Sequence, residues 1–228
     1  MDRIYCRERF VLLIAAVVFA IGVFPNVARA VPKLHVKMFA GAGSSTFVTR
    51  GETLGRARDT RFSWGGGVNL RVREYALFLE TGLNFRRIGF VVTDEVADFS
   101  AQFGGVIPAD VVGRNAKMNS LELPILGGWV PVQKPFWKTY LYAGLVNTFN
   151  IRGVIDNGKN FRNRIRFGPK KFPGVPIAIY QAGARMGVQF DLAMFNFDFS
   201  YTINLNSVTK TDYRTNVHDL RFNLGYLF

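Results

Sequence analysis

The sequence predicts an all-β protein, an eight-stranded antiparallel up-and-down transmembrane β-barrel. Aromatic and aliphatic residues alternate with polar ones over segments of about ten residues, the length that a tilted strand needs to cross a bilayer. Short connections alternate along the chain with long ones, and the sequence ends on an aromatic strand. After residue 30, no stretch approaches the roughly 18 consecutive apolar residues of a transmembrane helix.

The clearest strand signal lies near the carboxy-terminus. Positions Phe195 to Leu205 alternate without error between apolar and polar residues. The segment from Tyr180 to Phe190 alternates more weakly, and only Asp191 to Met194 separates the two, which predicts a hairpin. The other six predicted strands cover residues 33–43, 64–72, 77–86, 121–129, 138–149 and 220–228.

The connections predict the orientation of the barrel. Those near Arg73-Glu74, at 132–137 and at 191–194 are short, whereas the links at 44–61, 89–116, 153–176 and 207–213 are mostly long. Outer-membrane barrels combine short periplasmic turns with longer external loops. A soluble lipocalin-like barrel is the alternative, but its outside would be polar. We therefore expect a multi-pass barrel in the outer membrane of a Gram-negative cell.

The first 30 residues have the pattern of a secretory signal peptide. Three arginines precede an apolar run from Phe10 to Phe24, and Ala28-Arg29-Ala30 supplies the small residues of a signal-peptidase site. An uncleaved anchor is the alternative, although the run is short of the roughly 20 residues of a spanning helix. The predicted organisation is a signal peptide, residues 1–30, and a barrel domain, residues 31–228. Cleavage removes Cys6, the only cysteine.

Four segments of the mature chain resemble a known family. Asn119 to Gly128 reads NSLELPILGG and Lys138 to Gly144 reads KTYLYAG, and Gly183 to Val188 and Leu224 to Phe228 fit the same pattern. These segments resemble the PorT-like, or porin-like, outer-membrane β-barrel family common in Bacteroidetes. The resemblance implies an eight-stranded porin-like barrel. The family's name-giving member takes part in protein secretion across the outer membrane, so an accessory role in a secretion machinery is one alternative function.

The polar positions of the strands predict a charged interior. The expected lumen charge network consists of Arg71, Glu80, Arg86, Glu122, Arg185, Asp198 and Arg221. An eight-stranded barrel is just wide enough for its own side chains, and buried charges are costly unless paired. We therefore expect a lumen largely plugged by charged side chains and a structural or interaction role. A narrow porin-like channel is the alternative.

The net charge of +13 indicates anionic partners. An exported chain has little access to nucleic acid, so we expect outer-membrane lipids, above all lipopolysaccharide, and no nucleic acid. The third long loop is the most basic, and its cations are Arg152, Lys159, Arg162, Arg164, Arg166, Lys170 and Lys171. Arginine binds phosphate through two parallel hydrogen bonds. A solvated loop that pairs with the acidic second loop is the other interpretation.

The last strand and the histidines complete the functional expectations. Tyr226 and Phe228 resemble the terminal assembly signal of outer-membrane barrels, so the barrel-assembly machinery is an expected partner, besides secretion-system proteins. His35 and His218 are expected near opposite rims, and no His/Asp/Glu cluster has the spacing of a metal site. We therefore expect no enzymatic activity and no cofactor.

Signal-peptide cleavage is directly testable. We expect processing after Ala30, leaving Val31 as the mature amino-terminus, because Ala28 and Ala30 occupy the −3 and −1 positions. Mass spectrometry of protein extracted from the envelope measures the start; an intact Met1 would contradict the prediction.

Overall fold

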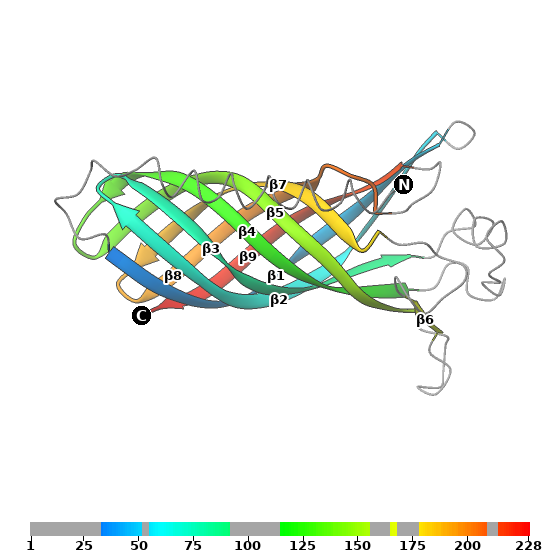
Figure 1. Ribbon diagram of the computed structural model, residues 1–228, viewed down its shortest axis with the longest axis horizontal. Helices are drawn as coiled ribbons and strands as arrows, with labels where there is room; N and C mark the ends of the chain where they lie inside the picture. The colour runs from blue at the N-terminus through cyan, green and yellow to red at the C-terminus, as the bar shows by residue number, and fades with distance from the viewer. Residues whose placement is uncertain (1–32, 52–54, 92–114, 156–164, 168–177, 209–213) are drawn as a thin grey trace, which may run out of the picture. The chain divides into compact units, whose positions relative to one another are not determined.

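The computed structural model describes residues 33–51, 55–91, 115–155, 165–167, 178–208 and 214–228, and residues 34–228 form one compact unit (Figure 1). The predicted signal peptide and most of the basic third loop lie outside the described residues.

The described strands form one closed antiparallel barrel. They are β1 (Lys33–Gly51), β2 (Gly55–Glu74), β3 (Leu77–Val91), β4 (Asn115–Gln133), β5 (Trp137–Ile155), β6 (Ile165–Phe167), β7 (Tyr180–Leu192), β8 (Phe195–Asn204) and β9 (Arg214–Leu227). Each long strand pairs with the next one along the chain, and β9 pairs with β1 to close the sheet. The short β6 pairs with the end of β5. The predicted eight-stranded antiparallel barrel is therefore confirmed, with β6 as an addition inside the predicted third loop.

Three tight turns lie at one end of the barrel, which we call the turn end. They join β2 to β3, β4 to β5 and β7 to β8, and the last residue of the chain lies at the same end (Figure 1). There the Phe228 amide donates to Val36 O at 2.9 Å. Tyr75 and Ala193 have φ values of 51° and 53°, the left-handed geometry that two-residue hairpin turns require. The first turn lies two residues beyond the predicted Arg73-Glu74 because β2 continues through Glu74.

The strands are longer than predicted at the opposite end, which we call the loop end. The segment 44–61 was expected to be a loop, but β1 stays paired with β9 as far as Arg50. Thr46 and Thr60 hydrogen-bond through their hydroxyls at 2.9 Å across β1 and β2. β1, β2, β4 and β5 have 19 or 20 residues, whereas a tilted strand needs about 9–11 to cross a bilayer. Where a strand extends beyond the lipid, its outward side chains need not be apolar. The extended segments therefore lack the alternation of apolar and polar residues that predicts a strand.

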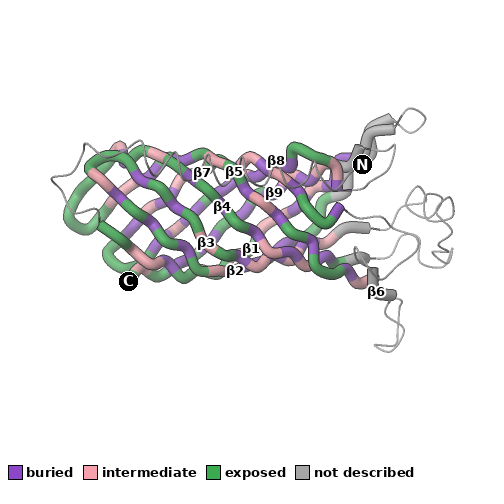
Figure 2. Tube along the Cα trace, in the orientation of Figure 1, coloured by how far each residue is buried: buried purple, intermediate pink, exposed green. Residues whose placement is uncertain are grey.

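The polarity of the barrel is the inverse of that of a soluble protein. Buried and exposed residues largely alternate along the long strands, as Figure 2 shows. Most outward side chains are apolar, for example Leu123, Phe199 and Leu220 with 40%, 49% and 58% exposure, while eleven charged side chains are buried inside. This is the arrangement of a barrel surrounded by lipid. Within the described residues, no helix is long and apolar enough to cross a membrane.

Arginine scanning of the outer wall tests this assignment. Phe199 packs against Phe222 in the middle of the outer face, with ring centroids 4.8 Å apart. We expect Phe199→Arg to lower the unfolding free energy by about 2–4 kcal/mol, because the charge would lie near the bilayer midplane. Leu192→Arg is the matched control at the turn end, where the cost should be about 0–1 kcal/mol. Denaturant unfolding in lipid vesicles measures both; equal losses would contradict the depth assignment.

Candidate functional site: the charged barrel interior

The barrel interior contains a nearly balanced set of charges. The buried basic residues are Lys37, Arg71, Arg73, Arg86, Arg185 and Arg221, and the buried acidic ones are Glu80, Glu122, Asp191, Asp198 and Asp219. All of them are at most 7% exposed. Six cations against five anions leave little net charge, so the interior can compensate its own ions. This is a requirement for burying them.

One group of ion pairs, the turn-side cluster, is centred on Arg71 and Glu80. Arg71 Nε lies 2.9 Å from Glu80 Oε2, and Arg71 Nη1 lies 2.9 Å from Asp191 Oδ2. Lys37 Nζ lies 2.5 Å from Glu80 Oε1, which also accepts from Asn69 at 2.7 Å. These contacts join β1, β2, β3 and β7, so the cluster bridges strands on opposite sides of the barrel.

Arg71 is also held by aromatic rings. Its guanidinium carbon lies 4.4 Å from the centroid of Tyr140 and 5.6 Å from that of Phe78. Phe78 and Tyr140 pack edge to face with their centroids 5.2 Å apart, inside an apolar cluster that includes Leu126 and Val146. A cation over an aromatic face is attracted by the ring quadrupole. One flank of the interior is thus filled by apolar packing, and the rest is filled by charged and uncharged polar side chains.

A second group, the loop-side cluster, is centred on Glu122. Its carboxylate lies 2.7 Å from Arg185 Nη2, 3.3 Å from Arg86 Nη1 and 3.3 Å from Arg221 Nη2. Asp219 shares two of these arginines: its Oδ2 lies 2.6 Å from Arg221 Nη2 and 3.3 Å from Arg86 Nη2. The other oxygen of Asp219 accepts from the hydroxyls of Ser45 and Ser63. Three arginines therefore depend on two carboxylates.

Asp198 is placed among neutral donors. Its carboxylate accepts from Tyr142 Oη at 2.7 Å and from Asn223 Nδ2 at 3.1 Å. Tyr142 lies on β5 and reaches Asp198 on β8 by crossing β7 over Gly187. A Cβ at Gly187 would lie 2.5 Å from Tyr142 Oη, so only glycine leaves room for this ring.

The structure brings together six of the seven charges of the predicted lumen network and adds partners that the sequence analysis missed. Lys37, Asp191 and Asp219 complete the clusters. Asp219 is two residues from Arg221, and Asp191 is two residues from Gln189. Because residues two apart on a strand face the same side, the alternation could have predicted that both aspartates point inward. Asp191 was assigned to a turn because β7 was expected to end at Phe190.

The two histidines lie far apart. His218 is paired in register with Thr46 and hydrogen-bonds Tyr201 Oη at 2.6 Å, whereas His35 lies eleven residues earlier on β1. Eleven strand residues span about 36 Å. No group of three or more His, Cys, Asp or Glu side chains in the described part of the chain is arranged to hold a metal ion.

The other predicted site residues are only partly described. Of the basic third loop, Arg152 is exposed at the loop end of β5, and Arg166 lies on β6. Lys159, Arg162, Arg164, Lys170 and Lys171 lie outside the described residues. Tyr226 and Phe228 pack edge to face on the outside of the turn end with ring centroids 4.8 Å apart. Their role as an assembly signal stays a prediction.

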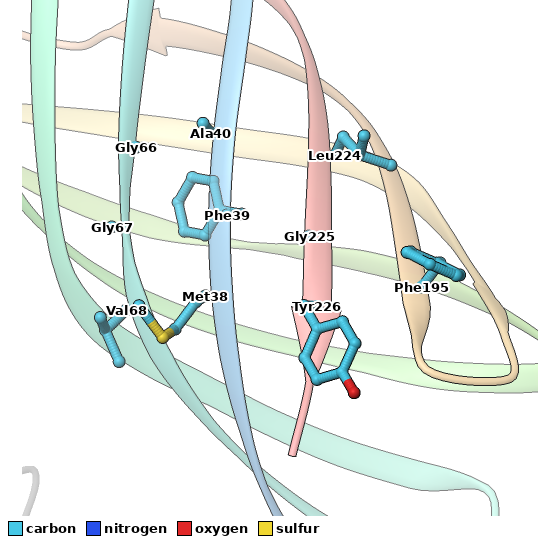
Figure 3. A pocket seen from close by; sticks show the side chains of 10 residues that line it. All are labelled: Met38, Phe39, Ala40, Gly66, Gly67, Val68, Phe195, Leu224, Gly225 and Tyr226. Carbon is cyan, nitrogen blue, oxygen red and sulfur yellow. The ribbon is translucent and has the colours of Figure 1, made fainter.

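A shallow apolar groove of about 570 Å³ lies on the outer wall, where β1 lies between β2 and β9 (Figure 3). Gly66 and Ala40 form its floor, and Met38, Val68 and Tyr226 stand beside it. The groove belongs to the apolar outer wall and contains no charged residue among its lining side chains.

Comparison with known proteins yields structural similarity only. No family model and no curated protein matches the chain. Among solved structures, Neisserial surface protein A is 14% identical, with 87% of this chain and 100% of that chain covered and a TM-score of 0.45. Ail of Yersinia pestis is 13% identical (85% and 99% covered, TM-score 0.40), and the amino-terminal β-barrel domain of Pseudomonas aeruginosa OprF is 12% identical (87% and 100% covered, TM-score 0.37).

Removing the shared carboxylate tests the interior network. Glu122→Gln leaves Arg86 and Arg221 with Asp219 alone and removes the carboxylate that Arg185 contacts, so we expect the unfolding free energy to fall by about 3–5 kcal/mol. Glu74→Gln, beside the β2–β3 turn, is the matched control and should change it by less than about 0.5 kcal/mol. Urea unfolding in detergent or vesicles measures both, and similar effects would contradict a central role for Glu122.

Proposed function

We propose that this protein is an integral outer-membrane β-barrel with a structural or interaction role, whose lumen is closed by its own charged side chains. The observation that carries the proposal is the inverted polarity: the outside is apolar while eleven buried charges lie inside. An apolar outer band about 25 Å tall is a property of barrels in outer membranes. A closed sheet also satisfies all backbone groups within lipid without helices.

The interior contacts support closure to solutes. The turn-side cluster links β2 to β7 through Arg71 and Asp191, and the loop-side cluster links β4 to β7 and β9 through Glu122. Each link crosses the lumen between strands that are not neighbours in the sheet. An eight-stranded barrel has an interior that side chains can fill.

The position of the turns supports the proposed orientation. Outer-membrane barrels have short turns on the periplasmic side and long loops outside. We therefore place the turn end, with Phe228, in the periplasm and the loop end at the cell exterior. The lipids of the outer leaflet, which include lipopolysaccharide, then surround the loop end.

A narrow channel is the second candidate. Several buried polar atoms have no hydrogen-bond partner among the described residues, including both amide atoms of Asn84 and Nε of Arg86. Buried polar groups of this kind are usually satisfied by ordered water. Ordered water inside the barrel would provide a path along which ions could cross. A component of a secretion machinery remains the alternative that the PorT-like resemblance suggests.

Planar-bilayer recording separates a closed barrel from a channel. We expect the purified full chain, inserted into a bilayer in potassium chloride, to give no steady conductance steps, because the two clusters cross the lumen. A porin recorded in the same bilayers controls for insertion. Heat-modifiable migration on gels checks that the barrel has formed. Reproducible single-channel steps would contradict closure and support the channel.

A further inference from the structure

The mouth of the lumen at the turn end contains basic side chains that lie nearer the turns than the turn-side cluster. Arg73 is the last inward residue of β2 before the tight turn to β3, and His35 lies two residues before Lys37 on β1. Lys138 on β5 is paired in register with Asp191 on β7. Arg73, Lys138 and Asp191 each interact electrostatically with the histidine ring, so these side chains lie near one another. We call His35, Arg73 and Lys138 the basic mouth.

Arg73 differs from the other buried cations in its lack of an ion pair among the described residues. Each of the other five has a side-chain nitrogen within 3.3 Å of a carboxylate oxygen; they are Lys37, Arg71, Arg86, Arg185 and Arg221. The side chain of Arg73 is only 6% exposed, and its Nη1 has no hydrogen-bond partner within the described part of the chain. A buried guanidinium without an acceptor is costly, because its N–H groups have lost their water. Arg73 therefore needs an acceptor.

The two buried carboxylates nearest the mouth are engaged by other donors. Asp191 Oδ2 lies 2.9 Å from Arg71 Nη1, and Asp191 Oδ1 accepts from Asn196 Nδ2 at 2.7 Å. Glu80 is shared by Arg71 and Lys37. Two carboxylates thus compensate the two cations of the turn-side cluster, and the charge of Arg73 is in excess.

The other carboxyl groups of the turn end face elsewhere. Glu74 follows Arg73 in β2, so its side chain faces the outer wall, and the carboxyl oxygen of Phe228 accepts from Val36 N at 3.3 Å. Among the segments outside the described residues, residues 1–32 adjoin the start of β1 and contain no acidic residue after Glu8. The remaining segments connect strands at the loop end. The excess positive charge is therefore a property of this end of the lumen.

From this arrangement, we propose that the basic mouth binds a small phosphate-type oxyanion. Arginine donates to phosphate oxygens through two parallel hydrogen bonds, and the imidazole and ammonium groups add further donors. A bound oxyanion would give Arg73 Nη1 an acceptor and would offset the excess charge. His35 and Lys138 are half-buried, so solvent reaches the mouth from the turn end.

The inference goes beyond the proposed closed barrel. The mouth lies nearer the turns than the contacts that cross the lumen, so an anion can occupy it whether or not ions pass through the barrel. The proposed orientation enters only through the source of the anion, which is the periplasm.

Calorimetric titration with inorganic phosphate tests the proposal. The full chain is refolded in a maltoside detergent, which has no phosphate group of its own, and the ionic strength is set with potassium chloride. We expect saturable binding of one phosphate per barrel, weakened by added salt because the contact is ionic. Arg73→Gln should raise the dissociation constant about tenfold or more, because hydrogen bonds to a charged partner are lost. Arg73→Lys keeps the charge without the forked geometry and should give an intermediate value.

A matched control and a second measurement give each outcome a meaning. Lys134→Gln removes an exposed charge in the β4–β5 turn and should leave the dissociation constant unchanged. Phosphate should also raise the urea midpoint of the original chain more than that of Arg73→Gln, because a ligand of the folded barrel stabilises it, whereas a general salt effect acts on both.

Heat-modifiable migration on gels separates failure to bind from failure to form the barrel. If Arg73→Gln forms no heat-modifiable barrel, Arg73→Lys provides the comparison. The absence of saturable heat from a correctly formed barrel, or equal affinity in the original chain and the Arg73 variants, would overturn the assignment.

Discussion

Closure of the sheet is the constraint on which the rest of the structure depends. In lipid, an unpaired backbone N–H or C=O has no water to bond with, so the first and last strands have to pair. β1 and β9 do so over fourteen residue pairs, from Lys37 with Leu227 to Arg50 with Arg214. Closure then turns every second residue inward, into a space that eight strands make narrow. The inward residues must fill that space and compensate one another's charge.

The two interior clusters meet this requirement in different ways. Around Arg71, one arginine is shared by two carboxylates and stacked on Tyr140, so the cation is surrounded. Around Glu122, one carboxylate is shared by three arginines, and Asp219 supplies the second negative charge. Each cluster joins strands distant in the sheet, so a change in one side chain affects several strands. Removing one partner from such a group is more damaging than removing an exposed ion pair.

The sequence predicted the fold and the inward direction of most interior charges, because a period of two determines which face a residue occupies. Arg71, Glu80 and Glu122 were identified in this way. The sequence did not predict which charges meet, because that depends on the register between strands such as β2 and β7, which are remote in the sheet. The length of β1 and β2 was missed for a different reason. Beyond the lipid, small polar residues such as Ser44 and Thr46 form a paired strand without an apolar face.

Interior packing also depends on side-chain contacts that the two-residue alternation of the sequence does not reveal. Tyr142 reaches Asp198 only because β7 presents Gly187 beneath the ring. Glycine in a strand is ordinarily a sign of a bend or a close approach, and here it is the close approach of a side chain from the next strand. The same reasoning applies to Phe78 and Tyr140, whose contact fills an apolar flank of an otherwise charged interior.

Arg86 and Arg87 on β3 have their charges compensated in different surroundings. They are adjacent in β3 and point to opposite faces of the wall. Arg86 is fully buried and faces Glu122 and Asp219, so its charge is compensated within the barrel. Arg87 faces outward beside Trp64, on the side of the wall where the described residues provide no carboxylate. A charge at the edge of an apolar band is stabilised by water or by headgroups of opposite sign. The inner arginine therefore contributes to the stability of the barrel interior, whereas the outer one lies on the outer wall beside Trp64.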